Sequence, residues 1–474
     1  MLSLPNRTKI VATIGPASNS PGTIKQLIQA GMSVARLNFS HGSYDDRART
    51  VRLLREISLE LDAPITILQD LQGPKVRVGQ LPNGAIALQE GEIISLVPLD
   101  RFTGEINTVP IDYPFLAEES QVGTRILLDD GLLELRIEAI ADTTVKCEVV
   151  RGGTLKSRKG VNLPSLDLRL PSLTEKDKQD LDFGLVQGVD WVSLSFVRRA
   201  QDIKDLKAVL AAKGMANMPV IAKIEKPQAI EHLDAILNEC DGVMVARGDL
   251  GVEMSPEKVP ILQKQIIRAC NLRGLPVITA TQMLDSMIHN PRPTRAEASD
   301  VANAIIDGTD AVMLSGESAV GSFPVQAVEM MVRIATEVER NIQFPNLPPF
   351  QTDTTAAISE ALNIIDRILK LRCIAAFTMT GSTARLVAAE RPKSPIIAFT
   401  PNLSTCRRLN LSWGVTPVLV QDTTSSMETY VEAIESYLLA HNLAVPSDTI
   451  LILGGSPIQS DGGTNFLKIH TIHP

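Results

Sequence analysis

Short apolar runs rich in β-branched residues alternate with amphipathic segments along two parts of this chain. Three such runs, KIVATI, SVARLNF and PITILQD, lie between Lys9 and Asp70. Five more follow from about Asp190: DWVSLSF, PVIAKIE, GVMVARG, LPVITAT and DAVMLSG. Each run has the length and composition of a buried strand, and each intervening stretch has the length and period of a helix. The pattern therefore predicts eight parallel strands, three plus five, with helices between them.

Eight strand–helix repeats are typical of an α/β protein with a closed (β/α)8 TIM barrel. We expect residues 1–72 and 172–341 to form this barrel. Functional side chains of such barrels gather at the C-terminal ends of the strands. The polar residues that follow the second to eighth runs are, in order, Arg36, Asn38 and Ser40, then Asp70, Ser195, Lys223 and Glu225, Asp249, Thr281, and Glu317.

The helical period disappears between the third and fourth runs. Residues 73–171 contain short alternating segments such as TRILLDDGLLELRIEAI, in which Asp130-Gly131 is a hairpin-turn signal. This pattern predicts a small β-barrel domain inserted at the catalytic mouth. An insertion there can act as a lid that excludes water, with hinges at Gly73-Pro74 and Leu170-Pro171.

A third unit follows a proline-rich stretch, FPNLPPFQTD, from Phe344 to Asp353. Helix-like segments such as METYVEAIESYLLAH alternate with strand-like runs, CIAAFT, PIIAFT, VTPVLV and TILILGG, and a last run lies near FLKIHTI. We expect residues 342–474 to form an open, mostly parallel α/β sheet with a regulatory role.

Composition narrows the class of protein. The chain has 474 residues, 44% of them hydrophobic, which is enough to fill several cores, and a net charge of −8. Acidic and basic residues are interleaved, so no basic face for nucleic acid or an anionic membrane is indicated. The five cysteines are scattered, with no CxxC pair, and no apolar run is long enough to span a bilayer. We expect a cytoplasmic protein.

The stretch from Pro219 to Glu253 carries the strongest chemical signal. In PVIAKIE the strand period of two places Lys223 and Glu225 on the same side. The next run ends in ARGDLG, which delivers Asp249 beside Gly248, where backbone amides are accessible to an anion. Two carboxylates, an ammonium and bare amides are suited to holding Mg²⁺ and a phosphate together. The alternative is a structural ion pair at a strand end.

These residues also carry a resemblance to a known family. IAKIEKPQAI resembles the active-site signature of the pyruvate kinases, and RLNFSHG, KGVNLP, MVARGDLGVE, TATQML and MLSGESAVG resemble other blocks of that family in the same order. The resemblance covers essentially the whole chain. It implies phosphoryl transfer from phosphoenolpyruvate to ADP, giving pyruvate and ATP, by a homotetramer.

The resemblance also assigns roles to the catalytic residues. Glu225 and Asp249 match the Mg²⁺ ligands, with Mn²⁺ as a possible substitute. Lys223 and Arg36 match the cations that neutralise the moving phosphoryl group. Thr281 matches the residue that assists protonation of the enolate, although its hydroxyl could equally cap the next helix. The substrate-binding positions are Arg36, Lys223, Ala246, Arg247, Gly248, Asp249 and Thr281.

Nucleotide and monovalent-cation positions follow from the same resemblance. The nucleotide-binding positions are Asn38, His41, Arg77 and Lys159, and the monovalent-cation positions are Asn38, Ser40, Asp70 and Leu71. Arg77 and Lys159 could be solvated surface charges, and a loop histidine such as His41 is often incidental.

One departure from the family pattern concerns K⁺. Where K⁺-dependent members read roughly LDTKGPEIR, this chain reads LQDLQGPKVR, so that Lys75 replaces a glutamate. An ammonium there can supply the positive charge that K⁺ would bring, so we expect no K⁺ requirement. The alternative is that Lys75 points to solvent.

An effector site is expected in the third unit. TMTGSTAR combines a strand end, hydroxyls and a helix start, a seat for phosphate, although a plain capped helix has the same pattern. In the family this loop and a second one, here Gly454 to Asn465, surround a sugar-phosphate site. A sugar phosphate or a nucleotide is the expected effector, and the candidate residues are Thr378, Thr380, Gly381, Ser382 and Thr383.

Two other functions remain as alternatives. An aldolase or lyase that forms an enolate on a Mg²⁺ barrel also needs a Glu and an Asp at strand ends, but it has no use for Lys159, Arg77 or a lid. A sugar-phosphate sensor without catalysis would not need Lys223 and Thr281.

Overall fold

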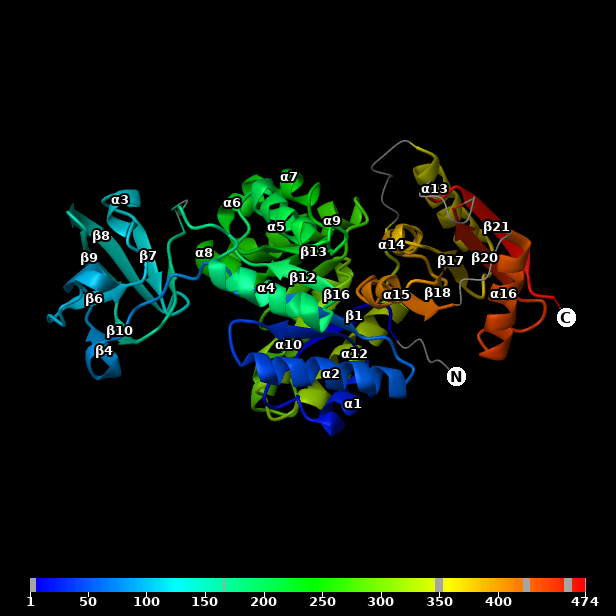
Figure 1. Ribbon diagram of the computed structural model, residues 1–474, viewed down its shortest axis with the longest axis horizontal. Coiled ribbons are helices and arrows are strands. Elements are labelled where there is room, and N and C mark those ends of the chain that lie inside the picture. The colour runs from blue at the N-terminus through cyan, green and yellow to red at the C-terminus, as the bar shows by residue number, and fades with distance from the viewer. Residues whose placement is uncertain are drawn as a thin grey trace.

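The computed structural model describes residues 6–164, 166, 168–345, 353–420, 427–455 and 463–473. They form three units arranged along the long axis of the molecule (Figure 1). The inserted unit lies at one end, the barrel in the middle and the C-terminal unit at the other end. The order of the units in space therefore differs from their order in the sequence.

The expected barrel is confirmed. Its eight strands are β1 (Lys9–Thr13), β2 (Met32–Asn38), β3 (Thr66–Asp70), β12 (Trp191–Leu194), β13 (Val220–Ile224), β14 (Gly242–Ala246), β15 (Val277–Ala280) and β16 (Ala311–Leu314). They close in the order β1-β16-β15-β14-β13-β12-β3-β2, and every pairing is parallel. All their carboxyl ends consequently open at one mouth.

Helices surround the barrel and connect its strands. They are α1 (Pro21–Gln29), α2 (Tyr44–Glu60), α4 (Glu175–Gln187), α5 (Ala200–Ala212), α6 (Pro227–Glu231), α7 (Leu233–Leu237), α8 (Arg247–Glu253), α9 (Val259–Asn271), α10 (Arg295–Ile306), α11 (Gly316–Ala319) and α12 (Pro324–Asn341). Local sequence sets several of their starts: Thr174 and Thr294 each cap a helix through a reciprocal capping box.

The barrel has two apolar layers. One lies between strands and helices, and the other fills the interior of the barrel with side chains such as Leu68, Ile221 and Met244. Leu411, which comes from the C-terminal unit, packs into the interior layer. The barrel is thus filled at its base by a side chain from another unit.

The inserted unit is rich in strands, as expected, and they form two sheets. Strands β11 (Val161–Asn162), β7 (Arg125–Leu128), β8 (Leu133–Ala141), β9 (Thr144–Arg151), β5 (Ile93–Pro98) and β6 (Thr108–Ile111) form a six-stranded sheet, and β10 (Gly153–Lys156) pairs with β4 (Ala85–Leu88). The unit has its own apolar core and one short helix, α3 (Leu116–Glu119). Asp129 and Asp130 adopt positive φ between β7 and β8, so the hairpin turn lies where it was expected.

The C-terminal unit is the expected open α/β sheet. Its strand order is β19 (Val415–Leu419), β18 (Ile396–Thr400), β17 (Ile374–Phe377), β20 (Thr449–Gly454) and β21 (Phe466–Thr471), and only β21 is antiparallel. Its helices are α13 (Thr354–Ile368), α14 (Ser382–Ala389), α15 (Leu403–Leu409) and α16 (Met427–Ala440). Separate apolar clusters cover the two faces of the sheet.

The C-terminal unit docks at the base of the barrel, where the strands begin. The Arg391 guanidinium lies 3.0 Å from the Asp310 carboxylate just before β16, and both side chains are buried. The buried Lys9 ammonium donates to the Val415 carbonyl at 2.7 Å, and the indole of Trp191 donates to the Arg408 carbonyl at 3.3 Å. The mouth of the barrel is therefore left to the inserted unit.

Some expectations lie beyond what the structure describes. Most of the proline-rich stretch Phe344–Asp353 and of the second effector loop, Gly454 to Asn465, falls outside the described residues. The exact domain limits given above, at residues 72, 171 and 341, stay predictions. Among the described residues, no helix is long and apolar enough to cross a membrane.

Candidate active site

A continuous chain of buried charges crosses the mouth of the barrel. Arg36 binds the Asp70 carboxylate at 2.6 Å, and the Lys223 ammonium lies 3.4 Å from the other oxygen of Asp70. The same ammonium lies 2.9 Å from Glu225 and donates to the Ser195 hydroxyl at 2.7 Å. Four charged residues from three strands thus alternate in sign along the mouth.

The register of the barrel brings these side chains together. Asn38 pairs with Asp70 across β2 and β3, and Asp70 pairs with Ser193 across β3 and β12. The Ser193 hydroxyl donates to Asp70 at 2.7 Å, which holds the carboxylate between Arg36 and Lys223. Closure of the sheet therefore turns residues far apart in the sequence into one cluster.

The charges change each other's pKa. Burial alone would lower the pKa of the Lys223 ammonium, but Asp70 and Glu225 outweigh it and hold that pKa above its ordinary value. Burial would raise the pKa of Asp70, yet Lys223 and Arg36 keep it below the ordinary value. Lys223 is consequently a firmly protonated cation, suited to charge neutralisation and not to acting as a base.

Glu225 and Asp249 fit a divalent cation. Burial raises the pKa of Glu225, and the nearby negative charge of Asp249 raises it further against the attraction of Lys223. Glu225 also accepts the Phe196 amide at 2.6 Å, which fixes its orientation. Two carboxylates close enough to repel one another are oxygen donors of the kind that Mg²⁺ and similar ions prefer.

Asp249 and Thr281 line a cavity of about 630 Å³ at the mouth. Asp249 lies in the first turn of α8, directly after β14. A Cβ atom at Gly248 would come within 2.6 Å of the Thr281 methyl group, so only glycine allows α8 to begin this close to Thr281. Thr281 itself has a φ of 76°, a left-handed conformation that a β-branched residue seldom adopts.

Two strand-end residues support the cavity with their side chains directed into the protein. The Arg247 guanidinium binds Asp300 at 2.7 Å and donates to the Thr281 carbonyl at 2.8 Å. Glu317 accepts the Leu284 amide at 3.1 Å and the Ser315 amide at 2.7 Å. Both side chains hold the Thr281 loop, and Arg247 and its partner Asp300 also line the cavity.

The nucleotide and monovalent-cation positions are distributed around the mouth. Arg77 donates to the Arg158 carbonyl at 3.1 Å, and Lys159 lies 2.7 Å from Asp129, both within the inserted unit. The side-chain oxygen of Asn38 accepts the Ser40 amide at 3.0 Å, and His41 is exposed. The Leu71 carbonyl accepts the Ser195 hydroxyl at 2.7 Å.

Lys75 faces the mouth. Its ammonium lies 4.0 Å from the Asp130 carboxylate, and Lys75 lines the same cavity as Asp249 and Thr281. The side chain is 28% exposed. It therefore lies at the opening between the inserted unit and the barrel.

A buried hydrogen-bonded triad joins the inserted unit to the barrel. Asn162, on β11, donates to Glu253 at 2.7 Å, and the Lys226 ammonium lies 2.6 Å from the same oxygen. Glu253 ends α8, the helix that begins with Asp249, and Lys226 follows Glu225. The second oxygen of Glu253 is buried with no hydrogen-bond partner among the described residues.

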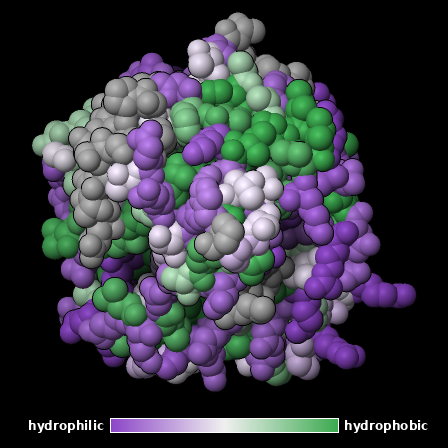
Figure 2. Space-filling model, turned by 90° about the vertical axis from the view of Figure 1, so that its right-hand side faces the viewer, coloured by the Kyte–Doolittle hydropathy of each residue, from purple (hydrophilic) through white to green (hydrophobic). Residues whose placement is uncertain are grey.

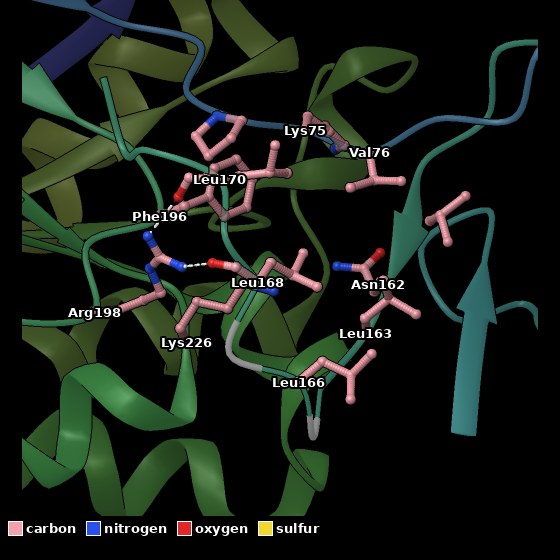
Figure 3. Close-up of a pocket in the computed structure, with 12 residues that line it drawn as sticks. Lys75, Val76, Asn162, Leu163, Leu166, Leu168, Leu170, Phe196, Arg198 and Lys226 are labelled. Atoms are coloured by element: carbon pink, nitrogen blue, oxygen red, sulfur yellow. Dashed lines mark hydrogen bonds between the residues drawn. The ribbon is translucent and has the colours of Figure 1, made fainter. Parts of the chain in front are cut away.

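An apolar pocket borders this triad (Figure 3). Figure 3 shows leucine side chains of the segment that follows β11, including Leu163, Leu166 and Leu168, near Lys226 and Phe196. Arg198 donates to the carbonyls of Leu168 and Leu170 and so fastens this segment to the barrel. The inserted unit is thereby attached by polar contacts on either side of an apolar seam.

The candidate effector loop surrounds the start of α14. Thr378 accepts the Gly381 amide at 2.8 Å, and the Thr383 hydroxyl accepts that of Thr464 at 2.8 Å, so both are used internally. Thr380 and Ser382 are exposed, and Gly381 has a φ of 92°. The exposed pair is the part of the loop that a ligand can reach.

Several residues of the site carried only weak sequence signals. Thr13, which accepts from Arg36 at 2.8 Å, and Ser193 were missed, and Ser195 was noted only for its place at a strand end. The alternation in VSLSF places Ser193 and Ser195 on one face of the strand end, and that signal could have identified them. The triad of Asn162, Lys226 and Glu253 had no local signal.

The fold and the site together define an enzyme that uses a (β/α)8 barrel with a cation–carboxylate cluster at its mouth. Residues 5–328 match the family model described as pyruvate kinase, barrel domain, and residues 356–470 match pyruvate kinase, alpha/beta domain. The chain therefore belongs to the pyruvate kinase family and is a phosphotransferase. The family implies a divalent metal ion, and the carboxylates described above fit one.

Relatives match the chain along nearly its whole length. Pyruvate kinase 2 of Synechocystis sp. is 50% identical, over 99% of this chain and 80% of the relative. The pyruvate kinase of Agrobacterium vitis is 46% identical, over 98% of this chain and 96% of the relative. A crystal structure of a pyruvate kinase from Cryptosporidium parvum superposes with a TM-score of 0.93 at 34% identity, covering 99% of this chain and 96% of that one.

The Asn162–Glu253 contact should control how firmly the inserted unit docks. Asn162→Ala removes a hydrogen bond to a buried carboxylate, which we expect to weaken docking by about 1.5–3 kcal/mol. The measurement is amide hydrogen exchange in β11 and α8, which should become faster in both elements.

Gln121→Ala, a change of an exposed amide in the same unit, is the control and should leave the exchange in α8 unchanged. Unchanged protection of α8 in Asn162→Ala would show that the contact does not link the two units.

Proposed function

We propose that this enzyme transfers the phosphoryl group of phosphoenolpyruvate to ADP at the mouth of the barrel, giving pyruvate and ATP. The observation that carries the proposal is the placement of the Lys223 ammonium between the carboxylates of Asp70 and Glu225, close enough to Asp249 for their charges to interact. Phosphoryl transfer depends mainly on positioning and on neutralising charge, which a buried ammonium held by two carboxylates supplies.

Glu225 and Asp249 would hold Mg²⁺, which neutralises charge on the substrate and the phosphoryl group when bound. Mn²⁺ has the same charge and accepts the same oxygen ligands, so we expect it to substitute. The backbone of Ala246, Arg247, Gly248 and Asp249 would bind the substrate carboxylate, because the amides at the start of a helix such as α8 favour an anion.

Lys223 and Arg36 would neutralise the phosphoryl group as it moves. Arg36 is held by Asp70 and Thr13, so its orientation is set before substrate arrives. Preorganised charges of this kind lower the barrier because little rearrangement is needed during the reaction. Thr281 would assist protonation of the enolate by relaying a proton, since its hydroxyl is too weak an acid to supply one by itself.

The inserted unit would close over the nucleotide. Arg77 and Lys159 lie on it and would reach the phosphates, while Asn38 and His41 would contact the nucleotide from the barrel side. The exposure of His41 and the cavity between the two units are compatible with these roles. Closure would exclude the water that competes for the phosphoryl group.

We further propose that Lys75 makes K⁺ unnecessary. The oxygen atoms at the monovalent-cation positions are already engaged: Asp70 by Arg36, Asn38 by the Ser40 amide, and the Leu71 carbonyl by Ser195. The Lys75 side chain lines the cavity of Asp249 and Thr281, where its ammonium would supply a positive charge and oppose the entry of a second cation. At 4 Å and an effective dielectric constant near 20, such repulsion amounts to about 4 kcal/mol.

A phosphorylated effector, a sugar phosphate or a nucleotide, is proposed for the loop at the start of α14. Thr380 and Ser382 offer exposed hydroxyls beside Gly381, where the helix amides are accessible. Thr378, Thr383 and Gly381 would shape the loop. Because this unit contacts the base of the barrel, an effector signal has a direct route to the catalytic strands.

A homotetramer in the cytoplasm is also proposed. Figure 2 shows apolar side chains gathered in the upper part of the end formed by the C-terminal unit. Ile364 and Ile368 of α13 and Ile469 of the edge strand β21 are exposed apolar residues of this unit. Exposed apolar side chains near a strand edge are suited to contact another copy of the chain.

Lys223→Met should abolish most turnover while substrate and metal still bind. Loss of one preorganised cation costs on the order of 10²-fold or more in kcat. The measurement is pyruvate formation from phosphoenolpyruvate and ADP in a coupled assay, with phosphoenolpyruvate binding followed separately.

The control should replace a lysine outside the mouth of the barrel. Lys178→Met is suitable because Lys178 is exposed, whereas Lys226→Met is not, because Lys226 holds Glu253. Near-normal turnover of Lys223→Met would contradict the assigned role, and failure of the native enzyme to form pyruvate would favour the lyase or sensor alternatives.

The native enzyme should turn over without K⁺. In a buffer whose only monovalent cation is tetramethylammonium, added KCl at matched ionic strength should change the rate by less than about tenfold, a difference of 1.4 kcal/mol. Lys75→Glu should create a K⁺ dependence, whereas Lys75→Gln removes the cation without adding a carboxylate. Strong stimulation of the native enzyme by K⁺ would refute the proposal.

Replacing both Thr380 and Ser382 with Glu should remove the response to sugar phosphates by like-charge repulsion. In the native enzyme we expect an effector to shift phosphoenolpyruvate saturation by about 1–3 kcal/mol of coupling. Ser404→Glu, on the exposed start of α15, is the control. If no sugar phosphate or nucleotide shifts the native saturation curve, the loop is only a helix cap.

A further inference from the structure

Two histidines and a glutamate meet at the far end of the C-terminal unit, away from the barrel. Glu435 lies in α16, His470 lies in the last strand, β21, and His473 follows that strand. The Glu435 Oε2 atom lies 2.6 Å from His470 Nε2 and 3.1 Å from His473 Nδ1. Figure 1 shows α16 beside β21 close to the C-terminus. Neither the catalytic site nor the effector loop includes these residues.

The spacing of the three groups suits one metal ion. Their potential ligand atoms all lie within 4.8 Å of one another. Zinc binds histidine nitrogen at about 2.0–2.1 Å and carboxylate oxygen at about 2.0–2.2 Å in tetrahedral sites, so neighbouring ligand atoms are roughly 3.3 Å apart. The Glu435–His470 and Glu435–His473 separations, 2.6 and 3.1 Å, are somewhat shorter than that value. The carboxylate and the rings would therefore move apart slightly to admit an ion, and the exposed His473 ring can turn.

The cluster is oriented as a ligand set. The Glu435 Oε1 atom accepts the His473 backbone amide at 2.7 Å, which aims Oε2 at both imidazoles. His470 and Glu435 are largely buried, with side-chain exposures of 6% and 13%, while His473 is 75% exposed. A partly buried pair with one accessible ring leaves an entry path and room for water as a fourth ligand.

We propose that Glu435, His470 and His473 form a zinc site, with water completing the coordination. Two imidazole nitrogens and one carboxylate favour Zn²⁺ and its neighbours Co²⁺ and Ni²⁺ over Mg²⁺, which prefers oxygen ligands alone. The site is therefore chemically distinct from the oxygen-rich pair Glu225 and Asp249 at the mouth of the barrel.

Metal binding here would fasten the last strand to α16. β21 pairs only with β20 in the sheet, so its other edge is unpaired within the sheet order. The residues just before β21 include Thr464, whose hydroxyl donates to Thr383 at the candidate effector loop. A bound ion would thus hold both a sheet edge and the segment that leads to it.

The experiment uses the full chain after chelator treatment, with Mg²⁺ in large excess to fill the catalytic site. Co²⁺ replaces Zn²⁺ as a probe because its visible absorption reports tetrahedral nitrogen and oxygen ligands. Bound Zn²⁺ is then counted by equilibrium dialysis. Metal competes with protons for the ring nitrogens, so binding should strengthen as pH rises.

Four variants separate this site from others. Glu435→Gln and His473→Ala remove ligands, and His473 is exposed, so its replacement should not prevent folding. His441→Ala removes another exposed imidazole of the same unit, and Asp249→Asn removes a ligand of the proposed catalytic metal. Turnover of phosphoenolpyruvate and ADP in His473→Ala and His441→Ala verifies that each is folded.

We expect one equivalent of Zn²⁺ and a tetrahedral Co²⁺ spectrum in the native protein, in His441→Ala and in Asp249→Asn. Both signals should be lost, with at least tenfold weaker binding, in Glu435→Gln and His473→Ala. The midpoint of thermal unfolding should also rise on addition of Zn²⁺, but only in proteins that keep all three ligands. Two results would overturn the proposal: an active His473→Ala variant that binds as much Zn²⁺ as the native protein, or a native protein that binds no Zn²⁺ in the presence of excess Mg²⁺. In either case the cluster is only a hydrogen-bonded contact.

Discussion

The buried ammonium of Lys223 is the group on which the arrangement of the mouth depends. Burial of an unpaired charge costs many kcal/mol, so Lys223 can occupy the end of β13 only if carboxylates lie within a few ångströms. Asp70 and Glu225 provide them, and Arg36, paired with Asp70, balances the second of these two negative charges. Because removal of one member of a buried charge pair typically costs about 3–5 kcal/mol, the cluster holds β2, β3 and β13 in register.

The two ends of the barrel are stabilised by different interactions, with charged pairs at the mouth and apolar packing at the base. The opposite end of the barrel is closed by apolar packing, with Leu411 inserted among the interior side chains. The Arg391–Asp310 pair fixes that closure. The C-terminal unit therefore stabilises the barrel without approaching the chemistry, and any regulatory signal from it must pass through the strands themselves or through contacts between copies of the chain.

Local patterns were sufficient to predict the fold because they report burial directly. The eight apolar runs are the eight strands, and the period of two placed Lys223 beside Glu225 correctly. The meeting of Arg36 with Asp70, or of Asn162 with Glu253, depends on closure and docking, which no local pattern contains. A position at a strand end also does not say where a side chain turns: Arg247 and Glu317 both turn beneath the Thr281 loop. The Glu435–His470–His473 cluster depends in the same way on a helix and a strand that are distant in sequence.

Helix α8 joins the inserted unit to the residues at the mouth of the barrel. Its first turn carries Asp249, its Gly248 allows contact with Thr281, and its last residue, Glu253, accepts from Asn162 of the inserted unit. Thr281 has a left-handed backbone conformation, and its carbonyl accepts a hydrogen bond from the guanidinium of Arg247, the first residue of the same helix. If a short helix moves as a rigid body, a displacement of Asn162 that is passed to Glu253 would carry Asp249 and the support of Thr281 with it. Under the proposed function, closure of the inserted unit and placement of the proposed catalytic groups would therefore be coupled through Glu253.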